Sequence, residues 1–208
     1  MGASTVPTMR CARRELPPLT ADFTSDFWRN LLAASLGDTR TGHSPRQATA
    51  VQTAWDADEL RVLFRAEDTH VAATLTQRDA PLYTEEVVEV FLDPVGDGES
   101  YFEIEVNALN CVLDLVLRRN RSGYMKDIAW DCDGLRTMVR QTASAWSAEL
   151  AIPFASLGAA PFPGARWRVN FTRIDRPLDL ARELTAWSPT ACGTFHAPAR
   201  FGVLEFVD

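Results

Sequence analysis

A carboxylate stands inside one of the most apolar stretches of this chain. Residues 81–94 read PLYTEEVVEVFLDP, and Glu89 interrupts the run of valines. The segment SYFEIEVNA follows closely and adds three more polar groups, Glu103, Glu105 and Asn107. Because side chains alternate along a strand, these three share one face, which Glu89 joins if the two segments pair. Carboxylates accept hydroxyl protons and amides both donate and accept, so this face could bind a ligand with many hydroxyl groups.

Two aromatic residues lie in loops near this polar face. Tyr83 precedes Glu89 by six positions, and Trp187 lies in the loop ELTAWSPT between the last strands. Aromatic rings stack on the apolar C–H faces of sugar rings, while the sugar hydroxyls need polar partners. A sugar clamp would require Tyr83 and Trp187 to face each other across roughly 7 Å, which is two stacking distances.

The polar face also has a plainer interpretation, as an ordinary face in contact with water. Glu89 could then form a structural ion pair with an arginine, such as Arg173 or Arg65. Val87 and Phe91 share the face of Glu89, however, and are costly in water. We therefore expect another segment to cover part of this face.

The elements that must position these groups are strands. Alternating patterns predict strands at 47–56, 60–68, 86–94, 100–108, 111–119, 135–141, 145–153, 166–175 and 201–208. Helical signals are limited to SDFWRNLLAA, with Ser25 as its N-cap, and to PFASLG, which ends on glycine. This pattern predicts an all-β antiparallel sandwich with one or two short helices. We expect residues 1–15 to form a loose arm and residues 16–208 to form one domain.

Composition narrows the class of protein. With 208 residues and 46% hydrophobic content the chain has material for one core. A net charge of −7 and the lack of a basic run argue against nucleic acid or an anionic membrane as partner. The first twenty residues lack the apolar core of a signal peptide, so either a cytoplasmic protein or an exported one whose signal was removed is expected. The four cysteines lack metal-site spacing; scattered thiols are the simplest interpretation, and one disulfide stays an alternative.

Several segments, in this order, resemble the family 9 carbohydrate-binding modules and their DOMON-like β-sandwich relatives. They are TAWDADELRVLFRAED, RDAPLYTEEVVEVFLDP, YFEIEVNALN, WSAELAIPF, WRVNFTRI, TAWSP and FHAPARFGVLEF. The resemblance implies an immunoglobulin-like or jelly-roll-like sandwich in which two aromatics hold a terminal sugar, while a Glu and an Asn bind its hydroxyls. These roles fall on Tyr83, Trp187, Glu89 and Asn107. The chain departs from the pattern with Tyr at 83, where Trp is commoner, and with Glu105, where an arginine can stand.

The expected function is non-catalytic binding of a terminal sugar or short oligosaccharide, with Glu105 and Arg173 as secondary contacts. Family members are often attached to glycoside hydrolases, which implies a role in polysaccharide breakdown. Hydrolysis by this chain is not expected, because Glu103 and Glu105 are neighbours on one strand and would not straddle a substrate. A sandwich that binds a protein partner and has lost the sugar is the main alternative.

No cofactor is required by this interpretation, although two are considered. The resemblance implies structural calcium, for which the turn DPVGDGES offers three oxygen ligands, Asp93, Asp97 and Glu99. Some DOMON-like domains bind haem, and the axial ligands would be His196 with Met125 or Met138. A packed, hydrogen-bonded role is the stronger expectation for His196.

Overall fold

The computed structural model describes residues 6–178 and 180–208. Strands dominate this part of the chain: β1 (Thr8–Arg13), β2 (Ala34–Ser35), β3 (Gly37–Asp38), β4 (Thr49–Trp55), β5 (Glu59–Glu67), β6 (Val87–Asp93), β7 (Ser100–Asn107), β8 (Val112–Asn120), β9 (Gly123–Asp127), β10 (Arg136–Gln141), β11 (Ala145–Pro153), β12 (Arg166–Asp175), β13 (Glu183–Ala186) and β14 (Gly202–Val207). The helices are short: α1 (Asp26–Arg29), α2 (Phe154–Leu157) and two 3-10 turns, η1 (Leu82–Thr84) and η2 (Pro198–Arg200). None of the described helices has the length and apolar character needed to cross a membrane.

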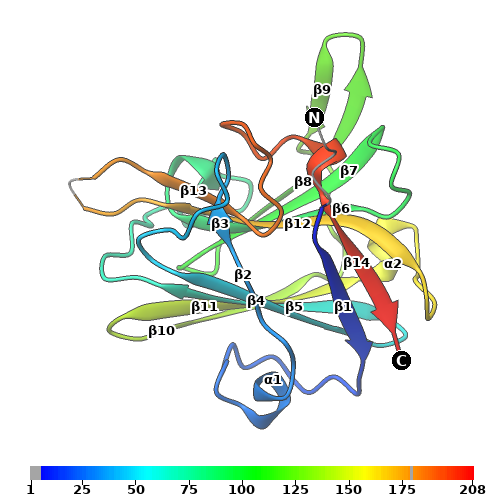
Figure 1. Ribbon diagram of the computed structural model, residues 1–208, viewed down its shortest axis with the longest axis horizontal. Coiled ribbons are helices and arrows are strands. Elements are labelled where there is room, and N and C mark those ends of the chain that lie inside the picture. Colours follow the sequence, from blue (N-terminus) through cyan, green and yellow to red (C-terminus); the bar gives the residue numbers. More distant parts are fainter. Residues whose placement is uncertain (1–5, 179) are drawn as a thin grey trace.

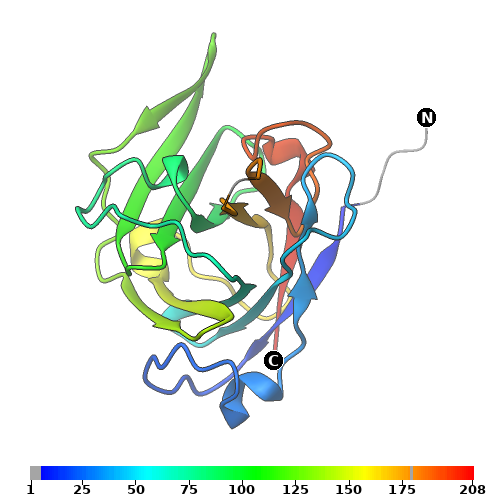
Figure 2. The same ribbon diagram turned by 90° about the vertical axis from the view of Figure 1, so that its left-hand side faces the viewer.

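The strands form one strongly curled sheet whose two halves face each other. Its order is β10-β11-β5-β4-β1-β14-β12-β6-β7-β8-β9. Figure 1 shows β4, β5, β10 and β11 as one layer, β6, β7, β8 and β12 as the other, and β1 and β14 running between them. Turned by 90°, the sheet is seen to curl round on itself (Figure 2). Most pairs are antiparallel, as predicted, but β1 pairs in parallel with both β14 and β4.

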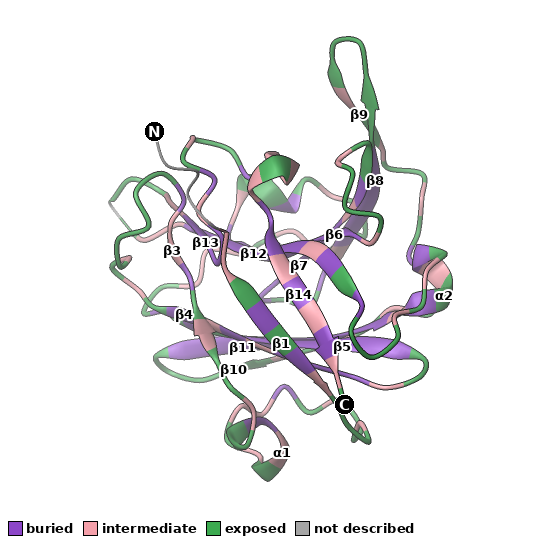
Figure 3. Cartoon of the chain, turned by 45° about the vertical axis from the view of Figure 1, so that its right-hand side comes forward, coloured by how far each residue is buried: buried purple, intermediate pink, exposed green. Residues whose placement is uncertain are grey.

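The main core lies between these two layers. Inward-facing side chains from both halves are fully buried there, among them Val62, Leu150, Val90, Ile104 and Phe171. Phe64 of β5 packs edge-on against Phe171 of β12, with 6.0 Å between the ring centroids. Figure 3 shows that the central strands are mostly buried, whereas most loops and β9 are exposed. The predicted all-β sandwich is confirmed.

A second, smaller core covers the outer face of β6 and β7. Val87 and Phe91 are buried there under Leu82, Phe195 and Phe201. Leu82 belongs to η1, and Phe195 and Phe201 flank η2, so two loops form a lid over the sheet. The expectation that another segment covers this face is confirmed, and the loops of this lid carry residues of the candidate site.

The expectation of a loose arm over residues 1–15 is wrong for Thr8–Arg13. These residues form β1, which lies inside the sheet, and its side chains Met9 and Cys11 are buried. The sequence of β1, TMRCAR, is short and contains two arginines, so its apolar alternation is too weak to predict a strand. Residues 1–5 lie outside the described residues. Of the helical segment predicted in SDFWRNLLAA only the four residues of α1 are helical, with Ser25 as the N-cap. The helix α2 ends at Gly158, as predicted, and this glycine is in the left-handed conformation.

Candidate functional site

A hollow of about 150 Å³ opens where β6 and β7 meet the lid loops. We call it the Tyr83 hollow, and its lining includes Tyr83, Glu89, Glu103, Lys126, Arg182 and His196. Of the residues predicted to bind a ligand, it brings together Tyr83 and Glu89. Glu105 lies next to Glu89 in the adjacent strand, directly beneath the lining.

Tyr83 forms part of the rim of this hollow. It is in η1, which the buried side chain of Leu82 anchors to the second core, while the Tyr83 side chain remains 44% exposed. The ammonium group of Lys126 lies 5.3 Å from the centre of the Tyr83 ring. This distance allows a cation–π contact, which holds Lys126 over one side of the ring. An exposed aromatic ring therefore lies beside a charged hydrogen-bond donor at the rim of the hollow.

The floor of the hollow consists of carboxyl groups. In the sheet register Glu89 stands opposite Glu105 on one side and opposite Thr172 on the other. Glu89 accepts a hydrogen bond of 2.6 Å from the Thr172 hydroxyl. Glu103 lies on the same face, two residues before Glu105, and all three glutamates are at most 2% exposed.

Burial shifts the ionisation of these glutamates. It raises the pKa of Glu89, Glu103 and Glu105 above the ordinary value of a glutamate. Repulsion from neighbouring carboxylates adds to burial for Glu89 and Glu105, while the positive charge of Lys126 partly opposes the shift. Such shifts away from ordinary values are concentrated at functional sites in proteins.

His196 closes the hollow from the lid. Its Nδ1 atom is 3.1 Å from the hydroxyl of Tyr101, and its ring packs edge-on against Phe91. Burial, followed by the charge of Lys126, lowers the pKa of His196 to about 4. The expectation of a packed, hydrogen-bonded histidine is confirmed. The two methionines considered as alternative haem partners of His196 are both exposed, Met125 in β9 and Met138 in β10.

Trp187 does not reach the hollow. It is 8% exposed and belongs to the main core, where its ring lies 5.6 Å from that of Phe171. The prediction of an aromatic clamp with Tyr83 is therefore wrong for this chain. The cause is alternation: residues 183–186 form β13, and since Ala186 faces the second core, Trp187 turns to the opposite side.

Asn107 is engaged by its own strand end. Its amide nitrogen donates to the carbonyl of Leu75 at 2.8 Å, and its amide oxygen accepts from the backbone N–H groups of Leu109 and Cys111. With donors and acceptor used and no exposed surface, Asn107 shapes the turn after β7. It does not line the Tyr83 hollow.

Arg173 lies on the opposite face of β12 from Thr172 and so points away from Glu89. Its guanidinium group is buried and pairs with three carboxylates, Asp68 at 3.1 Å, Glu86 at 2.8 Å and Asp175 at 3.3 Å. Glu86 also accepts a hydrogen bond from the indole of Trp146. This arrangement is a structural ion cluster, which corrects the expectation of a secondary ligand contact.

The turn proposed to hold calcium uses its acidic groups internally. Asp93 is buried and accepts from the backbone N–H groups of Gly96 and Gly98, and Asp97 accepts from that of Glu99. Glu99 in turn pairs with Arg119. In the described part of the chain, the carboxylate groups that converge are other ones. Calcium binding by this turn stays a prediction, and its acids already have partners within the protein.

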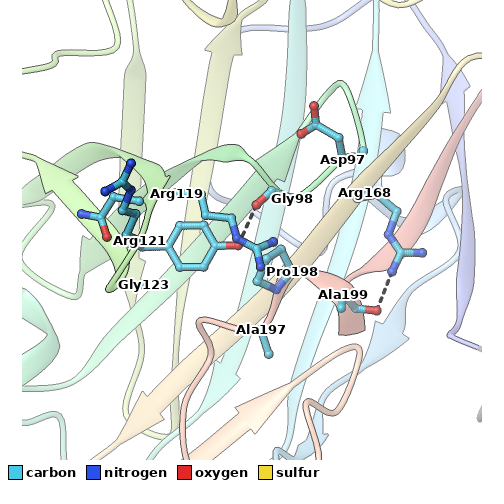
Figure 4. A pocket seen from close by; sticks show the side chains of 12 residues that line it. Asp97, Gly98, Arg119, Arg121, Gly123, Arg168, Ala197, Pro198 and Ala199 are labelled. Carbon is cyan, nitrogen blue, oxygen red and sulfur yellow. Dashed lines mark hydrogen bonds between the residues drawn. The ribbon is translucent and has the colours of Figure 1, made fainter.

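A second and larger hollow, of about 560 Å³, lies on the other side of the loop 193–199. We call it the arginine hollow, since three arginines line it, Arg119, Arg121 and Arg168. Figure 4 shows these side chains, with Arg168 beside Ala199 and apart from Arg119 and Arg121. Tyr124 also lines the hollow, and its hydroxyl donates to the carbonyl of Gly98 at 2.6 Å. Arg168 donates to the carbonyl of Ala199, and neither it nor Arg121 forms an ion pair among the described residues. This surface suits an anionic ligand.

Some lining residues of the Tyr83 hollow were not predicted from the sequence. Lys126 lies on β9, a hairpin strand whose residues are largely exposed, so it carried no alternating pattern. Composition was the one feature that could have drawn attention to this residue, because Lys126 is the only lysine of the chain. Arg182 lies just before β13, a strand that the sequence did not reveal.

Comparison with known proteins establishes the family of this chain. The model of the family described as carbohydrate family 9 binding domain-like matches residues 24–208. The chain therefore belongs to this family, and the resemblance noted in the sequence is confirmed.

Individual relatives are more distant. A protein of Arthroderma benhamiae, described as an extracellular protein, is 25% identical in an alignment 178 residues long that covers 78% of this chain and 80% of that protein. A crystal structure from Bacteroides uniformis matches with a TM-score of 0.78 and 15% identity over 97% of this chain and all of the other. A family 9 carbohydrate-binding module from Caldicellulosiruptor kristjanssonii, solved with glucose, matches with a TM-score of 0.71 and 18% identity over 96% of this chain and 95% of the other. At these identities the structures establish the fold.

Proposed function

We propose that this protein binds a sugar unit, without hydrolysing it, in the Tyr83 hollow. The observation that carries the proposal is that an exposed tyrosine ring and hydrogen-bonding groups converge on one hollow. Family membership supports it, as do the Caldicellulosiruptor kristjanssonii modules that were solved with glucose and with cellotriose.

Each lining group has a specific role in this proposal. Tyr83 offers its ring for stacking against the C–H face of the sugar. Lys126 and Arg182 donate to hydroxyl oxygens, and Glu89 and Glu103 face the hollow as acceptors. Because Trp187 is buried, one aromatic platform replaces a clamp. We therefore expect a weak complex, with a Kd of ~µM to mM.

Binding without hydrolysis follows from the arrangement of the acids. Glycosidases place two carboxyl groups on either side of the scissile bond. Here Glu103 and Glu105 lie side by side on β7, below the hollow, and Glu105 is 0% exposed. Such a pair cannot flank a substrate.

Isothermal titration calorimetry with glucose, xylose, cellobiose and xylobiose tests the proposal. Saturable binding should be lost in Tyr83→Ala and retained in Tyr124→Ala, which alters the arginine hollow instead. If no sugar binds to folded wild type, or if both variants bind like wild type, the proposal is wrong. The first of those results would favour a sandwich that binds a protein partner.

The arginine hollow supports a second candidate ligand, a sugar that carries a carboxylate. The three guanidinium groups that line this hollow match an acidic sugar better than a neutral one. Titration with glucuronic and galacturonic acid, in wild type and Arg121→Ala, tests this. Equal affinity for the neutral and the acidic sugar would contradict it.

A further inference from the structure

Three carboxyl groups converge under the Tyr83 hollow. Glu89 of β6 stands opposite Glu105 of β7, and Glu103 lies on the same face of β7. One oxygen from each of the three lies within 4.8 Å of the other two. All three side chains are buried, with relative exposures of 2%, 2% and 0% for Glu89, Glu103 and Glu105. We call this group the glutamate cluster.

Several oxygens of the glutamate cluster lack a partner. Within the described residues, neither side-chain oxygen of Glu105 accepts a hydrogen bond, and the same holds for Oε2 of Glu103. Thr172 satisfies one oxygen of Glu89. Buried polar atoms without a partner are costly, and native proteins contain few of them. The unsatisfied oxygens therefore indicate an occupant that binds carboxylate oxygen.

The two other groups of converging carboxylates in the described chain each contain an arginine. Arg173 pairs with Asp68, Glu86 and Asp175 at 2.8–3.3 Å. Arg78 pairs with Asp114 at 2.6 Å and with Asp131 at 2.8 Å. In the glutamate cluster no ion pair of 4.0 Å or less reaches any of the three acids from a described residue. It is the group that lacks its own cation.

We propose that the glutamate cluster binds a hard divalent cation, for which Ca²⁺ has the best size. Calcium takes oxygen ligands at ~2.3–2.6 Å, so ligands on opposite sides of the ion lie up to ~5 Å apart. The three oxygens of the glutamate cluster, all within 4.8 Å of one another, are close enough together to share one such ion. An all-oxygen ligand set selects Ca²⁺, Mg²⁺ or Mn²⁺ over softer metals.

The position of the cluster gives the ion access to solvent. Glu89 and Glu103 line the Tyr83 hollow, so water or hydroxyl oxygens in the hollow can complete the coordination. The site is separate from the turn of Asp93, Asp97 and Glu99, where the two aspartates bind backbone N–H groups of the turn and Glu99 pairs with Arg119.

Calorimetric titration of chelator-treated protein with CaCl₂ at pH 8, without sugar, tests the proposal. We expect one ion per chain, with the affinity reduced at least tenfold in Glu105→Gln and in Glu103→Gln. The matched control Asp97→Asn removes an acid from the turn and should bind Ca²⁺ like wild type. Thermal unfolding gives an independent reading, because an ion that binds only the folded state raises Tm, and the glutamine variants should lose that rise.

Different results separate the outcomes. Binding of Mg²⁺ or Mn²⁺ instead of Ca²⁺, with the same dependence on Glu105 and Glu103, supports the site and identifies another hard ion. If none of the three ions binds at millimolar concentration, the proposal is overturned. The buried glutamates would then be neutral because they are protonated, and no cation would be bound. Loss of Ca²⁺ binding in Asp97→Asn, with Glu105→Gln unaffected, also overturns it. Since no sugar is present, failure here leaves the proposed sugar binding to its own test.

Discussion

Arg173 stands beside Val88 in the sheet, one register step from Glu89, and this step decides its role. On a strand one step reverses the face, so Thr172 reaches Glu89 while Arg173 enters the ion cluster with Asp68 and Glu86. The sequence was enough to predict that polar residues lie near Glu89. Whether Arg173 contacts a ligand or forms a structural ion pair depends on how β12 pairs with β6, and the sequence alone does not reveal that register.

The first prediction concerns this ion cluster. Arg173→Met should lower the free energy of unfolding by about 3–5 kcal/mol, because removing the guanidinium leaves buried carboxylates uncompensated. Urea unfolding measures the loss. Arg29→Met is the control, since its pair with Asp26 is exposed and should contribute about 1 kcal/mol or less. Equal effects of the two substitutions would contradict the assignment.

The second prediction concerns the pH dependence contributed by His196. Its pKa is lowered in the folded state from 6.5 to about 4, so the unfolded chain takes up the proton first. The contribution of His196 to stability is full above pH ~6.5 and is lost as the pH falls towards ~4, by at most about 3 kcal/mol.

Urea unfolding of wild type and His196→Asn across pH 4 to 8 measures this contribution. Other acids titrate in both proteins, so the difference between the two curves isolates the histidine. That difference should change between pH ~6.5 and ~4. A constant difference would show that the imidazole is not held neutral by burial.

At the scale of elements, the strands that face the core on one side were predictable and the minor ones were not. The sequence of β7 alternates between polar and apolar residues, and β6 is an apolar run interrupted by Glu89, so both strands and their polar face could be predicted. Strand β9 lacks a buried stripe, and β13 is only four residues long. Missing β13 had a direct consequence for the site, because its alternation is what turns Trp187 into the core.

The third prediction tests the place of Trp187. Trp187→Ala should cost about 3–5 kcal/mol of stability by opening a cavity beside Phe171. Sugar affinity should be unchanged under conditions where the variant is folded. Urea unfolding measures the stability and calorimetry measures the sugar affinity. A loss of sugar binding with unchanged stability would contradict the prediction and support an aromatic clamp of Tyr83 and Trp187.

The fourth prediction tests whether β1 belongs to the sheet. Cys11 is 0% exposed and Arg10 is exposed on the same strand. Cys11→Asp buries a charge and should destabilise the fold by at least ~3 kcal/mol, whereas Arg10→Asp should have little effect. Urea unfolding of the two variants compares them directly. Near-neutral behaviour of both would mean that this segment is loose after all.

At the scale of the whole molecule, the family segments and their order in the sequence predicted the fold. The candidate site depends in addition on the two lid loops, which the sequence did not place. One curled sheet encloses the main core, and two loops distant in sequence close a second core over β6 and β7. Long-range closure of this kind places His196, Lys126 and Tyr83 around the same hollow. Tyr83 and Glu89 could be predicted because a single strand and its preceding loop carry both. The remaining lining could not, since it comes from segments joined only by tertiary packing.

The most direct test of the central claim is a crystal structure with the sugar that binds best in calorimetry. The account predicts a sugar ring at ~3.5–4.0 Å from the ring of Tyr83. It also predicts a sugar hydroxyl within hydrogen-bond distance of Lys126, Arg182, Glu89 or Glu103. A sugar found in the arginine hollow, or against another face of the sheet, would contradict the assignment of the Tyr83 hollow as the binding site.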